Sequence, residues 1–369
     1  MQPGNSPPLD TPLASIHRQA KADLGAWFGC TLPNHFGDSQ REYWFAQKSV
    51  ALIDKNYRAY LSFTGPDRVR YLNAILTNNI KDLALSHGTV SLLLNPQGHI
   101  LAEMETYARP ESLFCVSYTM IRELLLETLD KYIIMDDVTL TDETPRYGTL
   151  ALEGPHAARI ARELTGIDLT ALAELATQEA VVASIPCTIG RRSPGEFLGA
   201  EFLTPRQHLP TLWQILKDKT KAAGGGPAGY TALSALRLEQ GVPWFSYDFG
   251  EKQIPHEAGL ENSHISYTKG CYTGQEIVER VRSRGQVNRR RVSLLFGAAV
   301  PAPGAPLTAA GKEAGYVTRA AYSPRLSRAI GMGYVRKEST IIGTVLEWQN
   351  GTATVTKFPE QPKEAVANN

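Results

Sequence analysis

The sequence predicts an α+β protein with an internal duplication and a β-rich C-terminal domain. A strand pattern, a Gly-Pro pair and a helix pattern follow one another twice, at Gly65-Pro66 and at Gly154-Pro155, an offset of 89 residues. A further strand and helix follow each unit at a similar offset, which is typical of a duplicated module. After residue 291, short β-rich runs alternate with turns, as in a small antiparallel barrel or sandwich.

The first module is predicted over residues 15–145. Proline has the φ angle of a first helical turn, so Gly65-Pro66 marks the start of a helix. Asn95-Pro96-Gln97-Gly98 suits a type I turn between two strands. The elements expected are a helix at 15–28, a strand at 58–63, a helix from Gly65-Pro66 to residue 76, strands at 90–94, 99–107 and 112–118, and a helix at 121–133.

The second module is predicted over residues 146–288 and the barrel over residues 289–358. In the second module, strands at 148–152 and 196–203 are each followed by a helix, at 156–164 and 207–222. Gly224-Gly225-Gly226-Pro227 is expected to form a flexible break. Residues 1–14 and 359–369 lack a periodic apolar pattern, so both are expected to be disordered tails.

Composition restricts the function classes. The 369 residues indicate about two or three domains, and 38 basic against 37 acidic side chains leave a formal net charge of +1. This balance argues against a surface built throughout for polyanions. No run of 18 apolar residues and no leader pattern occur, so neither a membrane span nor a secretory signal is expected. Four cysteines without a CxxC pair indicate no metal site and fit a cytoplasmic protein.

Most of the chemical information lies in Lys269-Gly270-Cys271-Tyr272-Thr273-Gly274-Gln275-Glu276. Thr273 and Glu276 have the spacing of a capping box, which predicts a helix directly after Cys271. The positive end of that helix and the charge of Lys269 both favour a thiolate. Spacing alone leaves a reactive thiol and a structural cysteine in a tight turn as open interpretations. The other cysteines are expected to be buried spectators: Cys30, Cys115 and Cys187.

Together with Pro255-His256-Glu257-Ala258-Gly259 and Arg284-Gly285, this segment resembles the signature of the folate-binding YgfZ family. That family lies within the superfamily of the glycine-cleavage aminomethyltransferase, the T-protein. Weaker matches extend the resemblance over residues 40–355. They are Phe63-Thr64-Gly65-Pro66-Asp67, Leu236-Arg237-Leu238-Glu239-Gln240-Gly241-Val242-Pro243, Gly315-Tyr316-Val317-Thr318 and Ser323-Pro324.

The resemblance implies a three-lobed ring, in which two ferredoxin-like α+β lobes and a C-terminal antiparallel β-barrel surround a central folate cavity. It implies tetrahydrofolate or a one-carbon derivative as the cofactor. It also implies support of iron–sulfur cluster assembly or repair and of the iron–sulfur enzymes that modify tRNA, with assembly proteins or client enzymes as partners. The functional pair of the family falls on Cys271 and Lys269.

One departure from the superfamily bears on mechanism. Aminomethyltransferases carry an acidic residue in an Asn-Asp pair after the first Gly-Pro helix, and Asn79 stands at the corresponding position here. An amide does not act as a general base near neutral pH, so the glycine-cleavage reaction itself is not expected. The folate loop of those enzymes is kept only in part, at Ser193-Pro194-Gly195-Glu196. The residues expected at the folate are Arg237, Glu196, Asn79, Tyr272 and Gln275.

Three other features have a structural and a functional interpretation. The six arginines between Arg280 and Arg291 suit phosphate contacts. Without interleaved aromatic side chains, an exposed helix end leading into a barrel strand is favoured, and direct nucleic-acid binding is not expected. His256 is a candidate for a Cys-His pair, although a capped turn that packs on the motif is favoured. Tyr267 and Tyr272 either stack on a pterin or pack under the motif loop.

Three functions follow from this reading. The leading one is a folate-binding accessory protein for iron–sulfur enzymes in which Cys271 is the reactive thiol. The second is a folate-dependent aminomethyl or methyl transferase that acts on another donor. The third is a non-catalytic scaffold for iron–sulfur partners.

Overall fold

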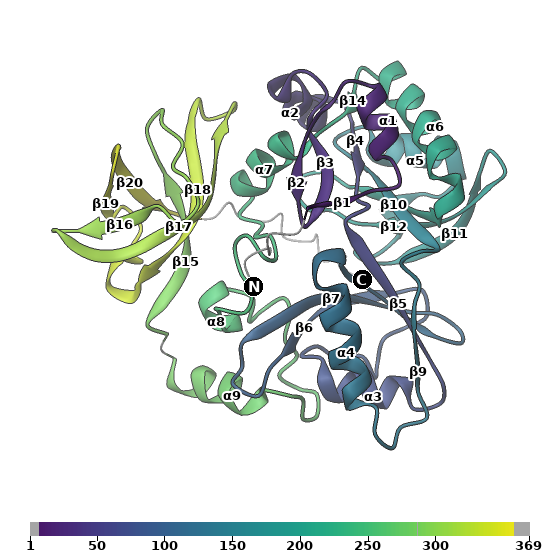
Figure 1. Cartoon of the computed structure of the whole chain (residues 1–369), viewed down its shortest axis with the longest axis horizontal. Coiled ribbons are helices and arrows are strands. Elements are labelled where there is room, and N and C mark those ends of the chain that lie inside the picture. The colour runs from purple at the N-terminus through teal and green to yellow at the C-terminus, as the bar shows by residue number, and fades with distance from the viewer. Residues whose placement is uncertain (1–6, 286, 358–369) are drawn as a thin grey trace, which may run out of the picture.

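Two sheets with the same underlying strand order form the α+β part of the protein (Figure 1). The computed structural model describes residues 7–285 and 287–357. The first sheet is antiparallel throughout, in the order β6-β7-β8-β5-β9. This lobe consists of β5 (Arg58–Thr64), α3 (Arg68–Ile75), β6 (Gly88–Leu94), β7 (Ile100–Ala108), β8 (Leu113–Tyr118), η1 (Thr119–Ile121), α4 (Arg122–Tyr132) and β9 (Thr139–Asp142).

The second sheet has the order β11-β12-β13-β10-β4-β14. It consists of β4 (Ala51–Asp54), β10 (Tyr147–Glu153), α5 (Ala157–Thr165), η2 (Leu169–Ala171), β11 (Thr177–Val182), β12 (Ile185–Arg191), β13 (Ala200–Pro205), η3 (Arg206–His208), α6 (Leu209–Ala222) and β14 (Gly226–Pro227). Without the edge strands β6 and β11 and the inserted β4, both lobes reduce to the ferredoxin-like βαββαβ order. The predicted duplication is therefore confirmed.

Each sheet has one face under helices and one face toward the other lobe. Ala102 and Met104 of β7 pack with α3 and α4, and a corresponding core lies between the second sheet and α5 and α6. The remaining faces meet where the Tyr60 hydroxyl lies 2.7 Å from the Thr149 hydroxyl. These two residues are separated by the repeat offset of 89, so equivalent positions of the two modules touch each other. This is the contact expected of two modules related by an approximate twofold axis.

The N-terminal segment joins the second lobe, which corrects two predictions. It forms β1 (Leu9–Asp10), α1 (Ala14–Gln19), β2 (Asp23–Trp27), β3 (Cys30–His35) and α2 (Ser39–Lys48). The helix expected at 15–28 is therefore a short helix and a strand, separated at Lys21 by a left-handed φ of 57°. The expected tail at 1–14 is ordered from β1 onward, because Leu13 is fully buried in the core of the second lobe. The tail positions 1–6 and the tail at 359–369 lie outside the described residues.

Helix α7 (Tyr230–Glu239) connects the second lobe to the barrel. All of its residues except Thr231 are buried, and it packs on β17 and β18 as well as on α2 and β3. The closed barrel has the order β15-β18-β17-β16-β19-β20, and pairing of β15 with β20 closes it. Its elements are β15 (Arg289–Leu295), β16 (Pro306–Ala309), β17 (Lys312–Ser323), β18 (Arg328–Arg336), η4 (Lys337–Ser339), β19 (Val345–Trp348) and β20 (Gly351–Thr356).

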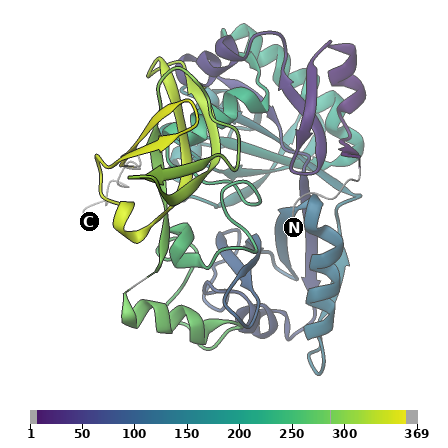
Figure 2. The same cartoon turned by 60° about the vertical axis from the view of Figure 1, so that its left-hand side comes forward.

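Two segments of the chain pack in the other lobe, so the packed lobes do not coincide with the predicted module boundaries. β4 lies within the range predicted for the first module, but it belongs to the second sheet. The segment that contains α8 (Pro255–Ala258) and α9 (Gln275–Arg284) lies within the range predicted for the second module, yet its apolar side chains pack on β6 and β7 of the first. Figure 2 shows these two helices below the barrel, next to the first lobe. The division at residues 145 and 146 thus separates the repeats but not their cores.

The glycine run before α7 is a packed segment, so the prediction of a flexible break is wrong. Gly226-Pro227 is β14, which pairs parallel with β4. A Cβ atom on Gly225 would lie 2.0 Å from the Val50 carbonyl oxygen. Glycine is required there because two backbones touch. Within the described chain, no helix combines the length and apolarity needed to cross a membrane.

Replacement of Leu13 by alanine tests the ordered N-terminus. We expect L13A to lower the free energy of unfolding by about 2–5 kcal/mol, because it leaves a cavity in the core of the second lobe. Urea denaturation measures this change. Leu9, which is 56% exposed, supplies the control, and L9A is expected to unfold as the unmodified protein does. If L13A were as stable as the unmodified protein, residues 9–14 would not be packed and the original prediction of a disordered tail would hold.

Candidate functional site

A cavity opens between the two α+β lobes, on the face of the first sheet that carries no helix. Its empty volume is about 260 Å³, part of which is open to solvent. The polar and aromatic side chains that line it come from β7, β8 and the start of β5: Tyr57, Arg58, Glu103, Glu105, Ser117 and Tyr118. The site is therefore built chiefly by the first repeat, where the second repeat faces it.

Glu103 is one of two carboxylates that line this cavity, and each of its two oxygens has a hydrogen-bond partner. The hydroxyl of Tyr118 donates to its Oε2 at 2.6 Å, and Nε2 of His264 lies 3.0 Å from its Oε1. Burial alone would raise the pKa of Glu103, but the bond and charge of His264 and the bond from Tyr118 hold that pKa below its ordinary value. Glu103 is thus an ionised acceptor at neutral pH.

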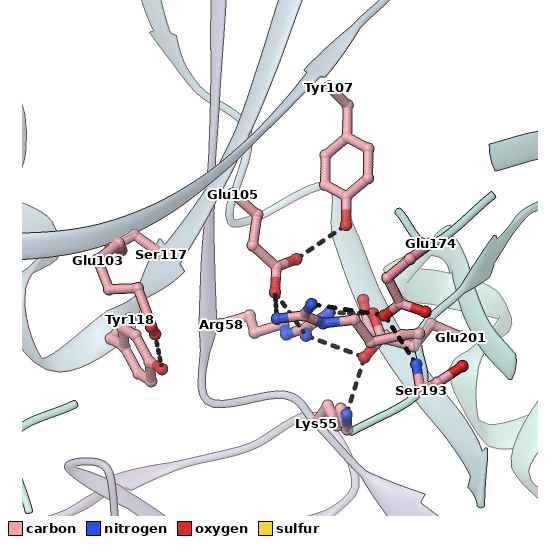
Figure 3. Close-up of polar contacts among 12 residues, drawn as sticks. Lys55, Arg58, Glu103, Glu105, Tyr107, Ser117, Tyr118, Glu174, Ser193 and Glu201 are labelled. Atoms are coloured by element: carbon pink, nitrogen blue, oxygen red, sulfur yellow. Dashed lines mark hydrogen bonds and ion pairs between the residues drawn. The ribbon is translucent and has the colours of Figure 1, made fainter. Parts of the chain in front are cut away.

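Beyond Glu103, the gap between the lobes holds a network of paired charges (Figure 3). Glu201 accepts hydrogen bonds from Lys55 at 2.8 Å and from Arg58 at 2.5 and 2.9 Å. Arg192 lies 2.8 Å from Glu105. Figure 3 shows Glu103 and Tyr118 on one side of Arg58 and Glu201 on the other. The cations near the cavity are accordingly occupied by glutamates of this chain.

Two of the cavity-lining residues, Tyr57 and Tyr118, belong to a larger cluster of aromatic rings. The rings of Tyr57 and Phe28 stack with centroids 4.3 Å apart, and Tyr57 also stacks on Tyr118 at 5.8 Å. Trp244 and Tyr247 meet the edge of Phe28 at 5.3 and 5.0 Å. A flat ring that entered the cavity would find aromatic faces beside an ionised carboxylate.

The motif loop is held to the first lobe by Lys269 and Gly274. The ammonium of Lys269 donates to the carbonyl oxygens of Asn73 and Leu76 at the end of α3, where the helix dipole favours a cation. Burial lowers the pKa of Lys269 to about 8. Gly274 has a φ of 80°, and a Cβ atom there would lie 2.6 Å from the Asn95 carbonyl oxygen in the β6–β7 turn. Lys269 therefore anchors the loop through α3.

The predicted capping box is not formed. Helix α9 begins at Gln275, its N-cap is Gly274 in the left-handed region, and no side chain caps it. The backbone amide of Tyr272 instead donates to the side-chain Oε1 of Gln275 at 3.3 Å. Gly274 occupies the N-cap in the left-handed conformation. Thr273 therefore does not hold the capping position that its spacing predicted. Cys271 lies three residues before the N-cap and is exposed.

The structure does not bring the other predicted folate residues to the cavity. Asn79 donates to Asp82 at 2.8 Å outside the cavity. Arg237 is buried in α7, where its Nη2 donates to both oxygens of Glu153 at 2.6 Å. Glu196 is exposed in the loop between β12 and β13. Their roles at a folate remain predictions, and the positions that these side chains occupy do not require a ligand.

Tyr272 and His256 are parts of the packing under the motif. Tyr272 is 6% exposed in the core that joins α9 to β6 and β7, and its hydroxyl has no partner within residues 7–285 and 287–357. His256 is also buried, which lowers its pKa, and its Nε2 lies 3.2 Å from the Tyr267 hydroxyl. This partner is a tyrosine and not Cys271, in agreement with the favoured structural interpretation of His256.

The arginine-rich segment is the end of α9 and the start of β15, as its structural interpretation predicted. Its side chains mostly meet acceptors of this chain. Four pairs are Arg280 with Glu276, Arg282 with Glu279, Arg289 with Glu257 and Arg290 with Glu261. Arg291 is buried and donates to the Ala258 carbonyl at 2.8 Å. Most of these charges therefore serve the junction between α8, α9 and the barrel.

Sequence reasoning missed Glu103 and its partners Tyr118 and His264. A signal for the carboxylate was present in the predicted strand at 99–107. Glu103 and Glu105 occupy alternate positions of an otherwise apolar strand, so they share one face. Two acidic residues on a buried sheet face require partners or a polar cavity.

Thiol labelling tests the distinct exposure of Cys271. We expect one thiol per native chain to react rapidly with a maleimide at pH 8, because burial raises the pKa of Cys30 and Cys115 to about 12 and that of Cys187 to about 11. Mass spectrometry locates the label. C271S is expected to remove the rapid reaction, and unfolding in urea should expose the remaining thiols. Rapid labelling of C271S would show that another cysteine is accessible.

Comparisons with known proteins agree with this architecture. The family described as the GCVT N-terminal domain matches residues 13–265, and the glycine cleavage T-protein C-terminal barrel domain matches residues 289–359. The chain is 30% identical to an aminomethyltransferase of Rubrobacter xylanophilus, covering 89% of this chain and 87% of that protein. It is 27% identical to one of Streptomyces avermitilis, covering 98% and 96%. The fold matches the crystal structure of glycine cleavage system aminomethyltransferase T from Bartonella henselae with a TM-score of 0.85 and 22% identity, covering 95% and 98% of the two chains. The chain therefore belongs to the glycine cleavage T-protein family.

Proposed function

We propose that this protein binds tetrahydrofolate or a one-carbon derivative in the cavity between its α+β lobes. The observation that carries the proposal is the ionised Glu103 carboxylate beside the stacked rings of Tyr57 and Tyr118. A pterin has N–H donors along one edge and a flat face, which complement an acceptor and an aromatic wall. The names of the relatives, which describe aminomethyl transfer, support the same ligand class.

The cavity suits the ring end of a folate better than the whole molecule. Its empty volume of about 260 Å³ includes space that is open to solvent, so the part enclosed by protein is smaller and does not take up a whole folate. Arg58 and Arg192 are paired with glutamates, so they do not offer a free site for the anionic tail. We infer that the pterin enters and that the tail lies outside. Tetrahydrofolate would supply the one-carbon carrier, and Glu103 would orient it by accepting its hydrogen bonds.

For the biological role we propose that of the YgfZ family, an accessory protein for iron–sulfur cluster assembly or repair in the cytoplasm. The clients would include the iron–sulfur enzymes that modify tRNA, and the partners would be assembly proteins or these clients. Cys271 supports this role because it is exposed in a loop that Lys269 and Gly274 fix to the first lobe. A protein partner can reach such a thiol, whereas the cavity accepts a small molecule.

Glu103 favours a second candidate, a folate-dependent aminomethyl or methyl transferase. The sequence argued against transfer because Asn79 replaces an expected carboxylate. Asn79 lies outside the cavity, however, and Glu103 places a carboxylate within it. A carboxylate is able to accept a proton where an amide is not. The two candidates therefore differ in whether Cys271 or Glu103 is indispensable.

Titration with tetrahydrofolate tests the ligand. We expect E103Q to weaken binding roughly 10- to 100-fold at pH 7, because hydrogen bonds to a charged group contribute about 1.5–3 kcal/mol. Isothermal calorimetry under reducing, oxygen-free conditions measures the affinity. Glu123 is 84% exposed on α4, so E123Q is the matched control and should bind as the unmodified protein does. No heat with any reduced folate would contradict the proposal.

Complementation separates the two roles. In a strain that lacks this protein, we expect C271A to fail to restore the activity of an iron–sulfur enzyme that modifies tRNA, since the exposed thiol is removed. S283A, at an exposed position of α9, is the control and should restore it. Measured tRNA modification gives the readout. Full restoration by C271A together with failure of E103Q would favour the transferase.

A further inference from the structure

Ser263, His264, Glu103 and Tyr118 form one continuous chain of hydrogen bonds that ends in the cavity. The Ser263 hydroxyl lies 2.7 Å from Nδ1 of His264, and Nε2 of the same ring lies 3.0 Å from Oε1 of Glu103. Tyr118 binds the other carboxylate oxygen at 2.6 Å. Each oxygen of Glu103 thus accepts one bond, an arrangement that a protonated carboxyl group would disrupt.

The backbone around His264 is fixed to the first lobe. Its carbonyl oxygen accepts from the buried Thr77 hydroxyl at 2.6 Å, and the amide of Ser266 donates to the Thr77 carbonyl at 3.0 Å. The amide of His264 donates to Leu260 at 3.0 Å. The His264 side chain is 12% exposed. The ring is therefore held against β7 by a segment that is itself pinned on both sides.

The hydrogen-bond chain selects one tautomer of the neutral ring. To donate to Glu103, His264 must carry its proton on Nε2, which leaves the lone pair on Nδ1. The Ser263 hydroxyl can donate to that lone pair. If the ring is protonated, the same hydroxyl accepts from Nδ1–H, so the contact with Glu103 survives in both charge states of the ring.

Among the described residues, His264 is the side chain able to carry a positive charge that is hydrogen-bonded to Glu103, while the charge of Arg192 acts on Glu103 without a bond. The other charged groups at the cavity have partners of their own. Arg192, from the loop after β12, lies 2.8 Å from Glu105, and Arg58 of β5 binds Glu201. Glu105, two residues along β7, adds a like charge that would favour protonation of Glu103.

We propose that His264 is a positioning residue that keeps Glu103 ionised and oriented toward the cavity, and that Ser263 fixes the His264 tautomer. This inference rests on the proposed folate function for its purpose, but the His264–Glu103 bond itself is a property of the free protein. Removal of the ring would leave Glu103 largely buried with Tyr118 as its remaining donor. Burial would then favour the neutral acid, and the cavity would lose its ionised acceptor as the pH falls.

Carboxyl NMR of the ligand-free protein tests the inference without a folate. With ¹³C-labelled glutamate side chains, the Glu103 signal is assigned by its loss in E103Q. Between pH 4 and 8, Glu103 of the unmodified protein should remain mostly ionised. In H264A its midpoint should rise by roughly one unit or more. H264Q keeps an N–H donor and should return the midpoint part of the way, and S263A should give a smaller rise than H264A. An unshifted midpoint in folded H264A, or equal midpoints in H264A and H264Q, would overturn the inference.

The pH dependence of tetrahydrofolate binding provides the functional arm. Affinity should fall at a higher pH in H264A than in the unmodified protein, in step with the Glu103 midpoint. Loss of affinity at the same pH in both would overturn the role of His264 in binding. If the unmodified protein binds no folate while the NMR midpoint moves as expected, the proposed function fails and the positioning of Glu103 by His264 stands.

Discussion

The charges buried between the two sheets are the constraint on which the site depends. Glu201 is bound by Lys55 and Arg58, and burial, which would raise the pKa of Glu201, is outweighed by these two cations. Desolvated ions are stable only when paired, and removal of one partner costs about 3–5 kcal/mol. The network therefore adds little net stability, because the cost of desolvating its charges offsets their mutual attraction. It requires the polar faces of the two repeats to meet in one arrangement, and the gap that it occupies continues into the cavity.

The duplication has diverged at the strand that carries the cavity carboxylate. Strand pairing places Thr106 beside Cys115 and Leu61 in the first sheet, and Ile189 beside Phe202 and Leu150 in the second. On this register Glu103 and Glu105 of β7 correspond to Pro186 and Thr188 of β12. One repeat thus supplies the acceptor, and its equivalent supplies none. Two sheets with the same underlying strand order thus carry a carboxylate pair on one repeat only.

Local patterns predicted the fold better than they predicted the site. The Gly-Pro offset and the β-rich end are encoded in short stretches, so the two lobes and the barrel followed from spacing and turn chemistry. Contacts between residues far apart in the sequence could not be predicted from such patterns. Lys269 bonds to Asn73 across 196 residues, and β4 belongs to a sheet whose other strands begin near residue 147. Asn79 was placed by its position after a helix, but the direction of its side chain depends on tertiary packing. Cys271 is exposed and the other three cysteines are buried, in agreement with their settings in the sequence. A cysteine in a polar loop, outside the periodic apolar pattern, does not pack in a core.

The exposed thiol and the residue that bonds to the cavity carboxylate are close in sequence, but they have different surroundings. His264 bonds to Glu103, while Lys269 bonds to the end of α3 and Cys271 faces solvent. Cys271 lies seven positions after His264, so their Cα atoms are at most about 25 Å apart. Cys271 is exposed and is not among the residues that line the cavity. A short segment held at Thr77 and at α3 therefore joins the proposed folate cavity to an exposed thiol. This geometry favours the proposed role in which Cys271 contacts a partner protein while the first lobe binds the folate.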